Sequence, residues 1–201
     1  MSPARVGSDV HAAAQRLRAD GVVGYPTETL YGLGVSIASP KAIERLFELK
    51  GRPGSVPLLI AVPSVDAISQ VAKVTPLAQS LFTLLPGPLT LILERDEDLP
   101  KSITAGGDSI GVRVPDHPVA QALLAKVSPI TSTSANRHGE APATTAEAAA
   151  GVFDDRVDYY LEGDSTPVGV ASTIVDCRGT IPHILREGAV REDEIRRHTP
   201  G

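Results

Sequence analysis

The 201-residue chain is 42% hydrophobic with a net charge of −5, so it can bury one sizeable core, and one domain spanning residues 1–201 is the default expectation. The acidic balance argues against a protein whose whole surface binds nucleic acid, and 3% aromatic residues without tryptophan leave few platforms for stacking bases. No apolar run approaches the roughly 18–20 residues of a membrane span, so we expect no membrane contact.

Cysteine and histidine usage limits the kinds of site that the chain can hold. A single cysteine, Cys177, excludes an internal disulfide framework and is typical of a reducing compartment, so we expect a cytoplasmic protein without a signal peptide. The five histidines are scattered without metal-ligand spacing, and we therefore expect no metal held by protein ligands.

The first third of the chain predicts two helices, a strand and a loop. Residues 9–20 have the apolar spacing of an amphipathic helix, and 22–25 form a short apolar strand. A hydroxyl-rich, glycine-containing loop is predicted at 26–34. Ser39 and Pro40 are typical of a helix start, and this second helix ends at Gly51.

Lys50 occupies a position in that second helix where the pattern predicts an apolar residue. Ile43, Leu46 and Phe47 mark the apolar face, and Lys50 follows seven residues after Ile43. One interpretation is a basic last turn that satisfies the helix dipole, with the Lys50 ammonium reaching water; such a turn would tolerate alanine. The other is that Lys50 and Arg52 bind a phosphate. The spacing leaves both open.

The rest of the chain alternates strands with helices and then becomes rich in strands. Arg113 lies in a predicted strand on the face opposite Ile110, Val112 and Val114. The pattern predicts an α/β fold with helices on both faces of the sheet, partly antiparallel because of the late strands. The predicted strands are 58–62, 89–93, 110–114, 129–133, 157–161, 172–176 and 183–186, and the predicted helices are 64–72, 76–85, 118–127 and 191–197.

Common nucleotide and hydrolase motifs are absent or in the wrong context. The chain has no GxxxxGK[ST] phosphate-binding loop. Residues 107–111 match GxSxG, but a loop precedes Ser109 and a strand follows it, which is the reverse of a nucleophile elbow. We therefore do not predict a serine hydrolase.

Three hydroxyl-rich turns stand beside predicted strand ends, at 27–29, at 131–134 with Asn136, and at 172–173. Each alone is typical of a helix cap or an Asx-type turn. Together with nearby cations they would suit a polyphosphate and a small polar substrate, although spacing cannot show that they converge. The cations are Lys50, Arg52, Arg113 and Arg186.

Seven short stretches along the chain together form a specific pattern. They are 26–34 (PTETLYGLG), 50–58 (KGRPGSVPL), 86–90 (PGPLT), 111–115 (GVRVP), 134–136 (SAN), 172–176 (STIVD) and 185–188 (LREG). In order and spacing they resemble the YrdC-like family, and the short length resembles its single-domain TsaC type. The likeness runs from about residue 10 to 190 and implies a twisted, open sheet of mixed parallel and antiparallel strands, flanked by helices, with a concave basic substrate cleft.

The resemblance implies that L-threonine, bicarbonate and ATP give threonylcarbamoyl-AMP and pyrophosphate, a nucleotidyl transfer in the modification of tRNA next to the anticodon. Lys50 and Arg52 would act on the triphosphate as catalytic residues. The implied ATP-binding residues are Lys50, Arg52, Ser109, Ser134, Asn136 and Arg186, and the implied threonine-binding residues are Thr29, Arg113, Ser132 and Ser172.

The resemblance also implies partners. Magnesium would be bound mainly through substrate phosphates, a threonylcarbamoyl transferase would receive the adenylate, and weak RNA contact is an open expectation. The alternative function is a YrdC-like module that binds structured RNA without forming an adenylate. Pyrophosphate release that requires threonine and bicarbonate, with RNA absent, separates the two.

Overall fold

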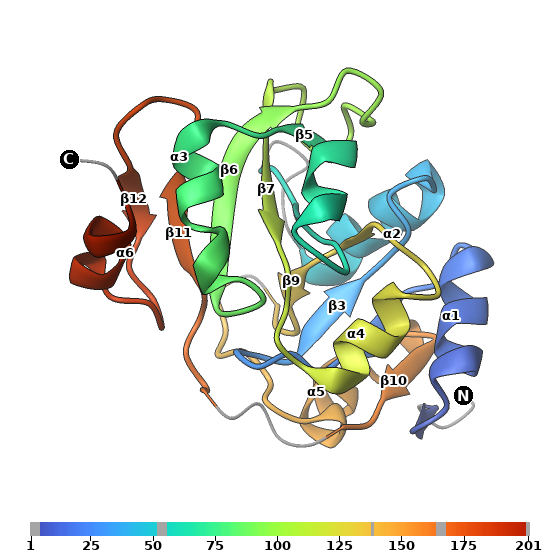
Figure 1. The fold of residues 1–201 in the computed structure, drawn as a ribbon. Coiled ribbons are helices and arrows are strands. Elements are labelled where there is room, and N and C mark those ends of the chain that lie inside the picture. The colour runs from blue at the N-terminus through green and yellow to red at the C-terminus, as the bar shows by residue number, and fades with distance from the viewer. Residues whose placement is uncertain (1–4, 52–55, 138, 164–167, 200–201) are drawn as a thin grey trace.

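The computed structural model describes residues 5–51, 56–137, 139–163 and 168–199, whose strands form two sheets with helices packed around them (Figure 1). The first sheet has the order β1-β10-β2-β3-β9, and the second has the order β12-β11-β6-β7-β4-β8, with β5 paired to β6. Parallel and antiparallel pairs occur in both sheets, so the predicted mixed α/β class is confirmed. One sheet was named from the sequence, and the structure divides its strands between two.

The strands and helices have the following bounds. The first sheet contains β1 (Val6–Gly7), β2 (Val23–Tyr25), β3 (Gly32–Gly34), β9 (Thr133–Ser134) and β10 (Tyr159–Leu161). The second contains β4 (Leu59–Ala61), β5 (Ala72–Lys73), β6 (Leu89–Arg95), β7 (Ser109–Arg113), β8 (Ile130–Thr131), β11 (Thr173–Asp176) and β12 (His183–Arg186). The α-helices are α1 (Val10–Arg18), α2 (Pro40–Lys50), α3 (Pro76–Ser80), α4 (Pro118–Leu124), α5 (Ala146–Phe153) and α6 (Glu192–His198).

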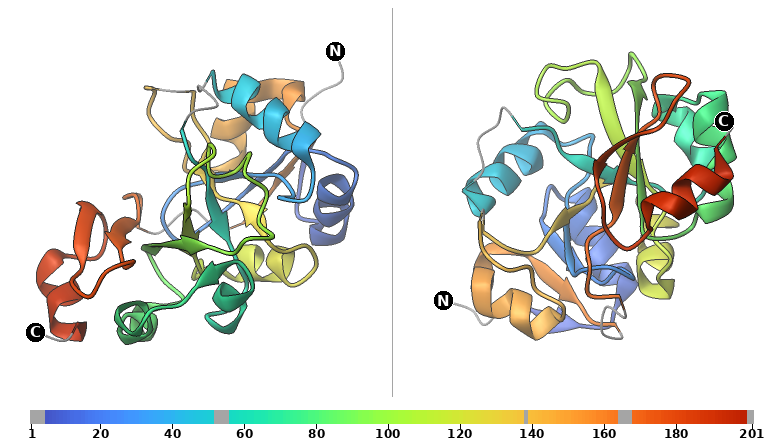
Figure 2. Two further views of the ribbon diagram at one scale, coloured as in Figure 1. Left: turned by 90° about the horizontal axis from the view of Figure 1, so that it is seen from above. Right: turned by 90° about the vertical axis from the view of Figure 1, so that its left-hand side faces the viewer.

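The three central strands of the first sheet, β10, β2 and β3, are buried on both faces. Successive residues of β10 point to opposite sides, so Tyr159 and Leu161 pack with α1 and α4, while Tyr160 packs in the larger core that includes α5. Figure 2 shows β1 and β10, from the two ends of the chain, side by side, as their parallel pairing requires. Among the described residues, no helix combines the length and the hydropathy that a membrane crossing needs.

The predicted start of α1 and both predicted ends of α2 are confirmed because local chemistry sets them, whereas α1 ends at Arg18, two residues before the predicted end. The Asp9 side chain accepts hydrogen bonds from the first turn of α1, and the Ser39 side chain accepts one from the Ala42 N–H at the start of α2. Gly51 ends α2 with φ 59°, a left-handed conformation that glycine adopts without strain. After α1 it is Asp20, rather than Gly21, that has the positive φ, 60°.

Long-range pairing overrides several predictions. The helix predicted at 64–72 is a 3-10 helix (Asp66–Gln70) followed by β5, because residues 72–73 pair with β6. The helix predicted at 76–85 is α3 followed by a second 3-10 helix (Phe82–Leu84). Residues 32–34 form β3 instead of continuing a loop; a Cβ on Gly34 would lie 2.9 Å from the Tyr25 ring, so this glycine admits the ring. The short β1, the helix α5 and a 3-10 helix at Asp154–Arg156 were not predicted.

The two sheets meet at Ser132. The chain leaves β8 of the second sheet at Thr131 and enters β9 of the first sheet at Thr133. The Ser132 N–H donates to the Leu59 carbonyl, and the Tyr25 hydroxyl donates to the Thr131 carbonyl. This junction brings polar segments from both sheets around one space.

Candidate functional site

A cavity of about 490 Å³ lies where the two sheets meet. Its walls come from the turn between β2 and β3, from β4 and β7, from the β8–β9 junction, and from the segments that lead into β11 and end β12. Six of the predicted site residues line it together, namely Thr29, Arg113, Ser132, Ser134, Ser172 and Arg186. The structure therefore brings together residues that are up to 157 positions apart in the sequence.

Hydroxyl groups order the turn between β2 and β3. The Thr27 Oγ1 donates to the Leu30 carbonyl at 2.7 Å and accepts from the N–H groups of Thr29 and Leu30. Because that proton is already donated, the Thr29 hydroxyl supplies the proton of the 2.9 Å contact between the two threonine side chains. The Thr29 Oγ1 is thereby left to accept from Arg113.

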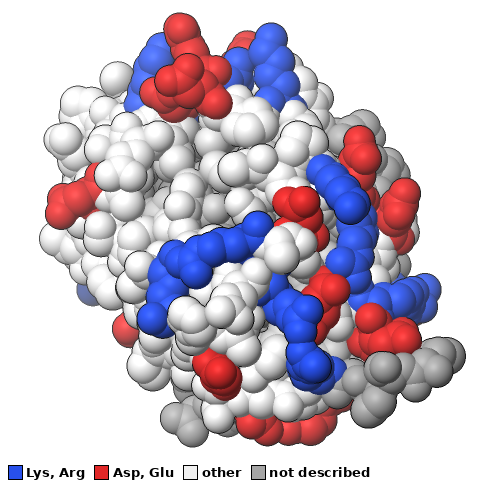
Figure 3. Space-filling view, turned by 90° about the vertical axis from the view of Figure 1, so that its right-hand side faces the viewer, with Lys and Arg blue, Asp and Glu red and all other residues white. Residues whose placement is uncertain are grey.

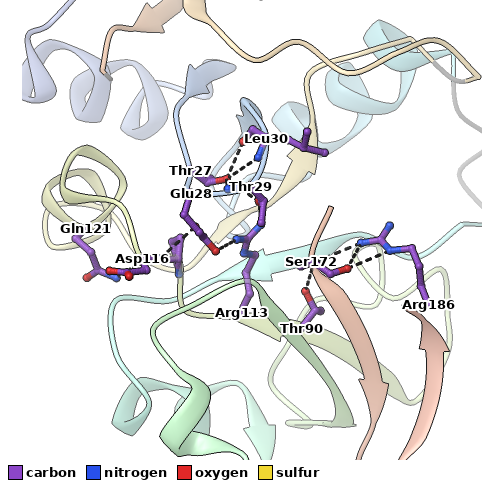
Figure 4. A network of polar contacts seen from close by, with 11 residues as sticks. Thr27, Glu28, Thr29, Leu30, Thr90, Arg113, Asp116, Gln121, Ser172 and Arg186 are labelled. Atoms are coloured by element: carbon purple, nitrogen blue, oxygen red, sulfur yellow. Dashed lines mark hydrogen bonds and ion pairs between the residues drawn. The ribbon is translucent and has the colours of Figure 1, made fainter. Parts of the chain in front are cut away.

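Arg113 ends β7 as a buried cation whose side chain is only 8% exposed (Figure 4). Its Nη2 donates to Glu28 Oε1 at 2.5 Å and its Nη1 donates to Thr29 Oγ1 at 3.1 Å. The Glu28 Oε2 accepts from the Asp116 N–H at 3.1 Å, so the carboxylate bridges two segments. Within the described part of the chain, the buried Arg113 Nε has no hydrogen-bond partner. A buried, partly unsatisfied guanidinium is suited to an additional planar anion.

Glu28 is the residue that the sequence analysis missed. The loop at 26–34 was described as hydroxyl-rich, and the acid in its middle received no role. The signal in the sequence was one acid in that loop together with Arg113 in a strand predicted to be covered on both faces, since a buried charge is usually paired. The pairing itself depends on the fold, because 85 positions separate Glu28 from Arg113.

Ser172 and Arg186 form the opposite side of the cavity (Figure 4). The Arg186 guanidinium donates to the Ser172 carbonyl from Nε at 3.2 Å and from Nη2 at 2.8 Å. The Ser172 Oγ also shares a 2.8 Å hydrogen bond with the fully buried Thr90 hydroxyl. Partial burial, and then repulsion from Arg113, lower the pKa of Arg186. The two arginines therefore act on one another across the cavity, which favours an anion between them.

Lys50 is buried and holds the turn after β9. Its Nζ donates to the carbonyls of Ser134 at 2.5 Å and Asn136 at 2.9 Å, and the residue is 4% exposed. The prediction that Lys50 lies on the buried face of its helix is confirmed. The interpretation that its ammonium reaches water is wrong, because the α2 end packs against this turn and backbone carbonyls solvate the charge instead. A contact with phosphate stays a prediction.

The remaining predicted ATP-binding residues do not all line the cavity. The Asn136 side chain is engaged within its own turn, since its Oδ1 accepts from Ser134 Oγ and its Nδ2 donates to the carbonyls of Arg137 and Glu140. Ser109 begins β7, at the end of the strand opposite Arg113, and the described lining residues do not include it. Arg52 lies outside the described residues.

The described residues hold no cluster of metal ligands, and Ser109 lacks the setting of a nucleophile elbow. Among residues 5–51, 56–137, 139–163 and 168–199, no cluster of three His, Cys, Asp or Glu side chains could bind a metal ion. Ser109 is the first residue of a strand, so the reversed context of its GxSxG match is confirmed. The described cavity lining offers hydroxyl groups and guanidinium groups, which suit carboxylates and phosphates.

The face on the side of α1 and α2 carries interleaved charges (Figure 3). Lys and Arg side chains lie among Asp and Glu side chains there. A surface that binds RNA through its phosphates needs a continuous positive field. This face does not provide one.

Comparison with known proteins gives consistent matches in sequence and in fold. The model of the Sua5/YciO/YrdC family, described as telomere recombination, matches residues 15–188. Threonylcarbamoyl-AMP synthase of Bacillus subtilis (strain 168) is 39% identical over 189 residues, which cover 91% of this chain and 54% of that protein. The Pyrococcus abyssi protein of the same name is 36% identical over 189 residues, which cover 92% of this chain and 56% of that protein.

A solved structure matches over nearly the whole chain. The crystal structure of P. abyssi Sua5 complexed with L-threonine has a TM-score of 0.91 and 33% identity, and covers 98% of this chain and 61% of that one. The chain thus spans about half the length of the two curated relatives that it matches.

Proposed function

The chain belongs to the Sua5/YciO/YrdC family, and from that premise we propose that it is a threonylcarbamoyl-AMP synthase, a nucleotidyltransferase that uses L-threonine, bicarbonate and ATP. The observation that supports this most directly is the cavity in which Arg113 and Arg186 face one another among hydroxyl groups. Such a cavity suits one small molecule that carries a carboxylate together with another that carries phosphates.

The proposed reaction needs positioning and charge neutralisation more than a protein nucleophile. The threonine amine, after losing a proton, attacks the carbon of bicarbonate, water leaves, and a carbamate forms. A carbamate oxygen then attacks the α-phosphorus of ATP in line, the bond to the β-phosphate breaks, and pyrophosphate leaves with that electron pair. No residue is needed to form a covalent intermediate, and the described cavity lining contains no histidine or cysteine.

Arg113 is proposed to bind the threonine carboxylate. Its Nε has no hydrogen-bond partner among the described residues, and the planar guanidinium can present two parallel N–H groups to a carboxylate. The hydroxyls of Thr29, Ser132 and Ser172 line the same cavity and would hold the polar groups of threonine.

Arg186 and Ser134 are proposed to bind ATP from the other wall, where Arg186 is fixed by Ser172. Lys50 and Asn136 order the turn that carries Ser134, so their contribution to ATP binding begins with the shape of that turn. Lys50 and Arg52 remain the proposed catalytic residues at the triphosphate, and Ser109 remains a proposed nucleotide contact. Magnesium would enter as part of the MgATP substrate, held by phosphate oxygens and water and neutralising phosphate charge.

Product chemistry defines the proposed partners. A mixed anhydride of a carbamate and AMP is an activated acyl donor, so a transferase that moves the threonylcarbamoyl group to tRNA would consume it. Both ATP and tRNA place the reaction in the cytoplasm. The RNA-binding alternative receives less support, because the relatives named above are synthases and the face in Figure 3 is of mixed charge.

The test is pyrophosphate release by the purified chain with RNA absent. We expect release only when threonine, bicarbonate and MgATP are all present, and a nucleotide product whose mass is that of threonylcarbamoyl-AMP. Omission of each component in turn is the control. RNA binding that weakens steeply with salt, without any such turnover, would instead favour the RNA-binding function.

A further inference from the structure

We propose that Glu28 makes the cavity selective for zwitterionic amino acids over carboxylic acids that lack an amine. This inference rests on the proposed function, because it takes threonine as the ligand of Arg113. It assigns a role to a residue that neither the sequence nor the likeness to synthases assigned. Glu28 acts through Arg113 and is therefore a positioning and specificity-determining residue.

Glu28 is held so that it stays beside Arg113. One carboxylate oxygen accepts from Arg113 Nη2, and the other accepts from the Asp116 N–H at 3.1 Å. Both side chains of the ion pair are nearly buried, with exposures of 6% for Glu28 and 8% for Arg113. Two contacts and burial together prevent the carboxylate from turning out to solvent.

The ion pair between Glu28 and Arg113 changes the net charge of the cavity wall that a ligand contacts. An unpaired arginine in a buried cavity would attract any carboxylate, but the positive charge of Arg113 is already offset by Glu28. A carboxylate bound beside Arg113 therefore brings the local charge of Glu28, Arg113 and the ligand to minus one, and Arg186 opposes that charge only from the opposite side of the cavity. The ammonium of an amino acid restores neutrality, whereas a hydroxy acid leaves the negative charge uncompensated. Glu28 thus makes binding stronger for a ligand that carries an ammonium than for one that carries only the carboxylate.

The experiment compares two ligands by isothermal titration calorimetry, without ATP or bicarbonate, so that the threonine amine stays an ammonium. The ligands are L-threonine and the matching 2,3-dihydroxybutanoate, which has a hydroxyl in place of the amine. We expect the unmodified protein to prefer threonine, and Glu28→Gln to reduce that preference at least about tenfold, the effect of losing one close charge interaction.

Two further variants isolate the charge. Asp158→Asn is the matched control, because the Asp158 carboxylate also accepts from an arginine, Arg45, and from a backbone N–H, that of Val22, outside the cavity lining. It should leave the preference unchanged. Glu28→Asp keeps the charge and should keep the preference even if both ligands bind more weakly; it decides the question should Glu28→Gln not fold. A variant that only loosens the site would weaken the binding of both ligands by the same factor and leave the preference unchanged.

Failure of the proposed substrate and failure of the proposed role of Glu28 give different results in this experiment. If the unmodified protein does not bind threonine, the proposed substrate is wrong and the role of Glu28 falls with it. If it binds threonine and Glu28→Gln retains the full preference, only the role of Glu28 is refuted. Loss of the preference in Glu28→Asp would also refute that role.

Discussion

Lys50→Ala is expected to destabilise the fold in addition to slowing turnover at least about tenfold. One interpretation of the sequence was a solvated helix end that tolerates alanine, but the structure gives the Lys50 ammonium two carbonyl acceptors, Ser134 O at 2.5 Å and Asn136 O at 2.9 Å. Removing the side chain takes both hydrogen bonds from the turn that carries Ser134. The stability loss comes from this turn, and the activity loss comes from the turn together with the proposed contact of Lys50 with the triphosphate.

The size of the expected loss in unfolding free energy follows from the two hydrogen bonds of Lys50. A hydrogen bond to a charged group contributes about 1.5–3 kcal/mol, and removal of the ammonium also relieves its desolvation, so we expect a net loss of about 2–3 kcal/mol. At about 2–4 °C per kcal/mol for a chain of this size, the melting temperature should fall by roughly 4–12 °C. The chain should still fold, because typical stabilities are about 5–15 kcal/mol.

The assay is thermal unfolding followed by circular dichroism, with Lys41→Ala as the control. Lys41 lies on the same helix, α2, but is exposed, so its replacement should change the stability by no more than about 0.5 kcal/mol. Equal melting temperatures for Lys50→Ala and Lys41→Ala would refute the assignment of Lys50 as the support of the turn.

Three other changes test the cavity and the core. Arg113→Lys should raise the threonine KM at least about tenfold, because lysine lacks the planar fork, and an effect confined to the ATP KM would contradict its assignment. Arg186→Gln should raise the ATP KM without a large change in melting temperature, since the amide can still donate to the Ser172 carbonyl; an unchanged ATP KM would count against it. Burial raises the pKa of the Cys177 thiol to about 12, so the folded chain keeps a proton that the unfolded chain loses above about pH 8.5. The free energy of unfolding should therefore fall as the pH rises above that value, by up to about 1.4 kcal/mol per pH unit, and Cys177→Ala should flatten the decline in urea titrations; equal slopes would contradict the argument.

Local chemistry explains which elements the sequence predicted well. Caps act on residues within one helical turn, so Asp9, Ser39 and Gly51 placed the ends of α1 and α2. The prediction at 64–72 failed because β5 owes its strand conformation to its partners in β6, which lie more than twenty positions away in the sequence. The first sheet was not separated from the second because its strands come from both ends of the chain.

The site was predictable as a set of residues and not as an arrangement. Six residues inferred from the family resemblance line one cavity, but the spacing of the residues alone could not bring Arg113 and Arg186 together. Glu28 went unnoticed for a related reason. Its partners are Arg113 and the Asp116 N–H, and they reach it only because the chain after β7 passes the turn between β2 and β3.

The junction at Ser132 explains how a chain with so many short strands can hold substrates firmly. The cavity walls belong to different sheets, so its shape depends on how those sheets are fixed to one another. Buried hydrogen bonds fix them: Thr131 Oγ1 accepts from the Val35 N–H at 3.0 Å, and the Thr131 carbonyl accepts from Tyr25. Since Thr131 and Tyr25 are fully buried, these bonds do not exchange readily with water. The sheet junction therefore gives the cavity a preformed shape, which the proposed in-line displacement requires.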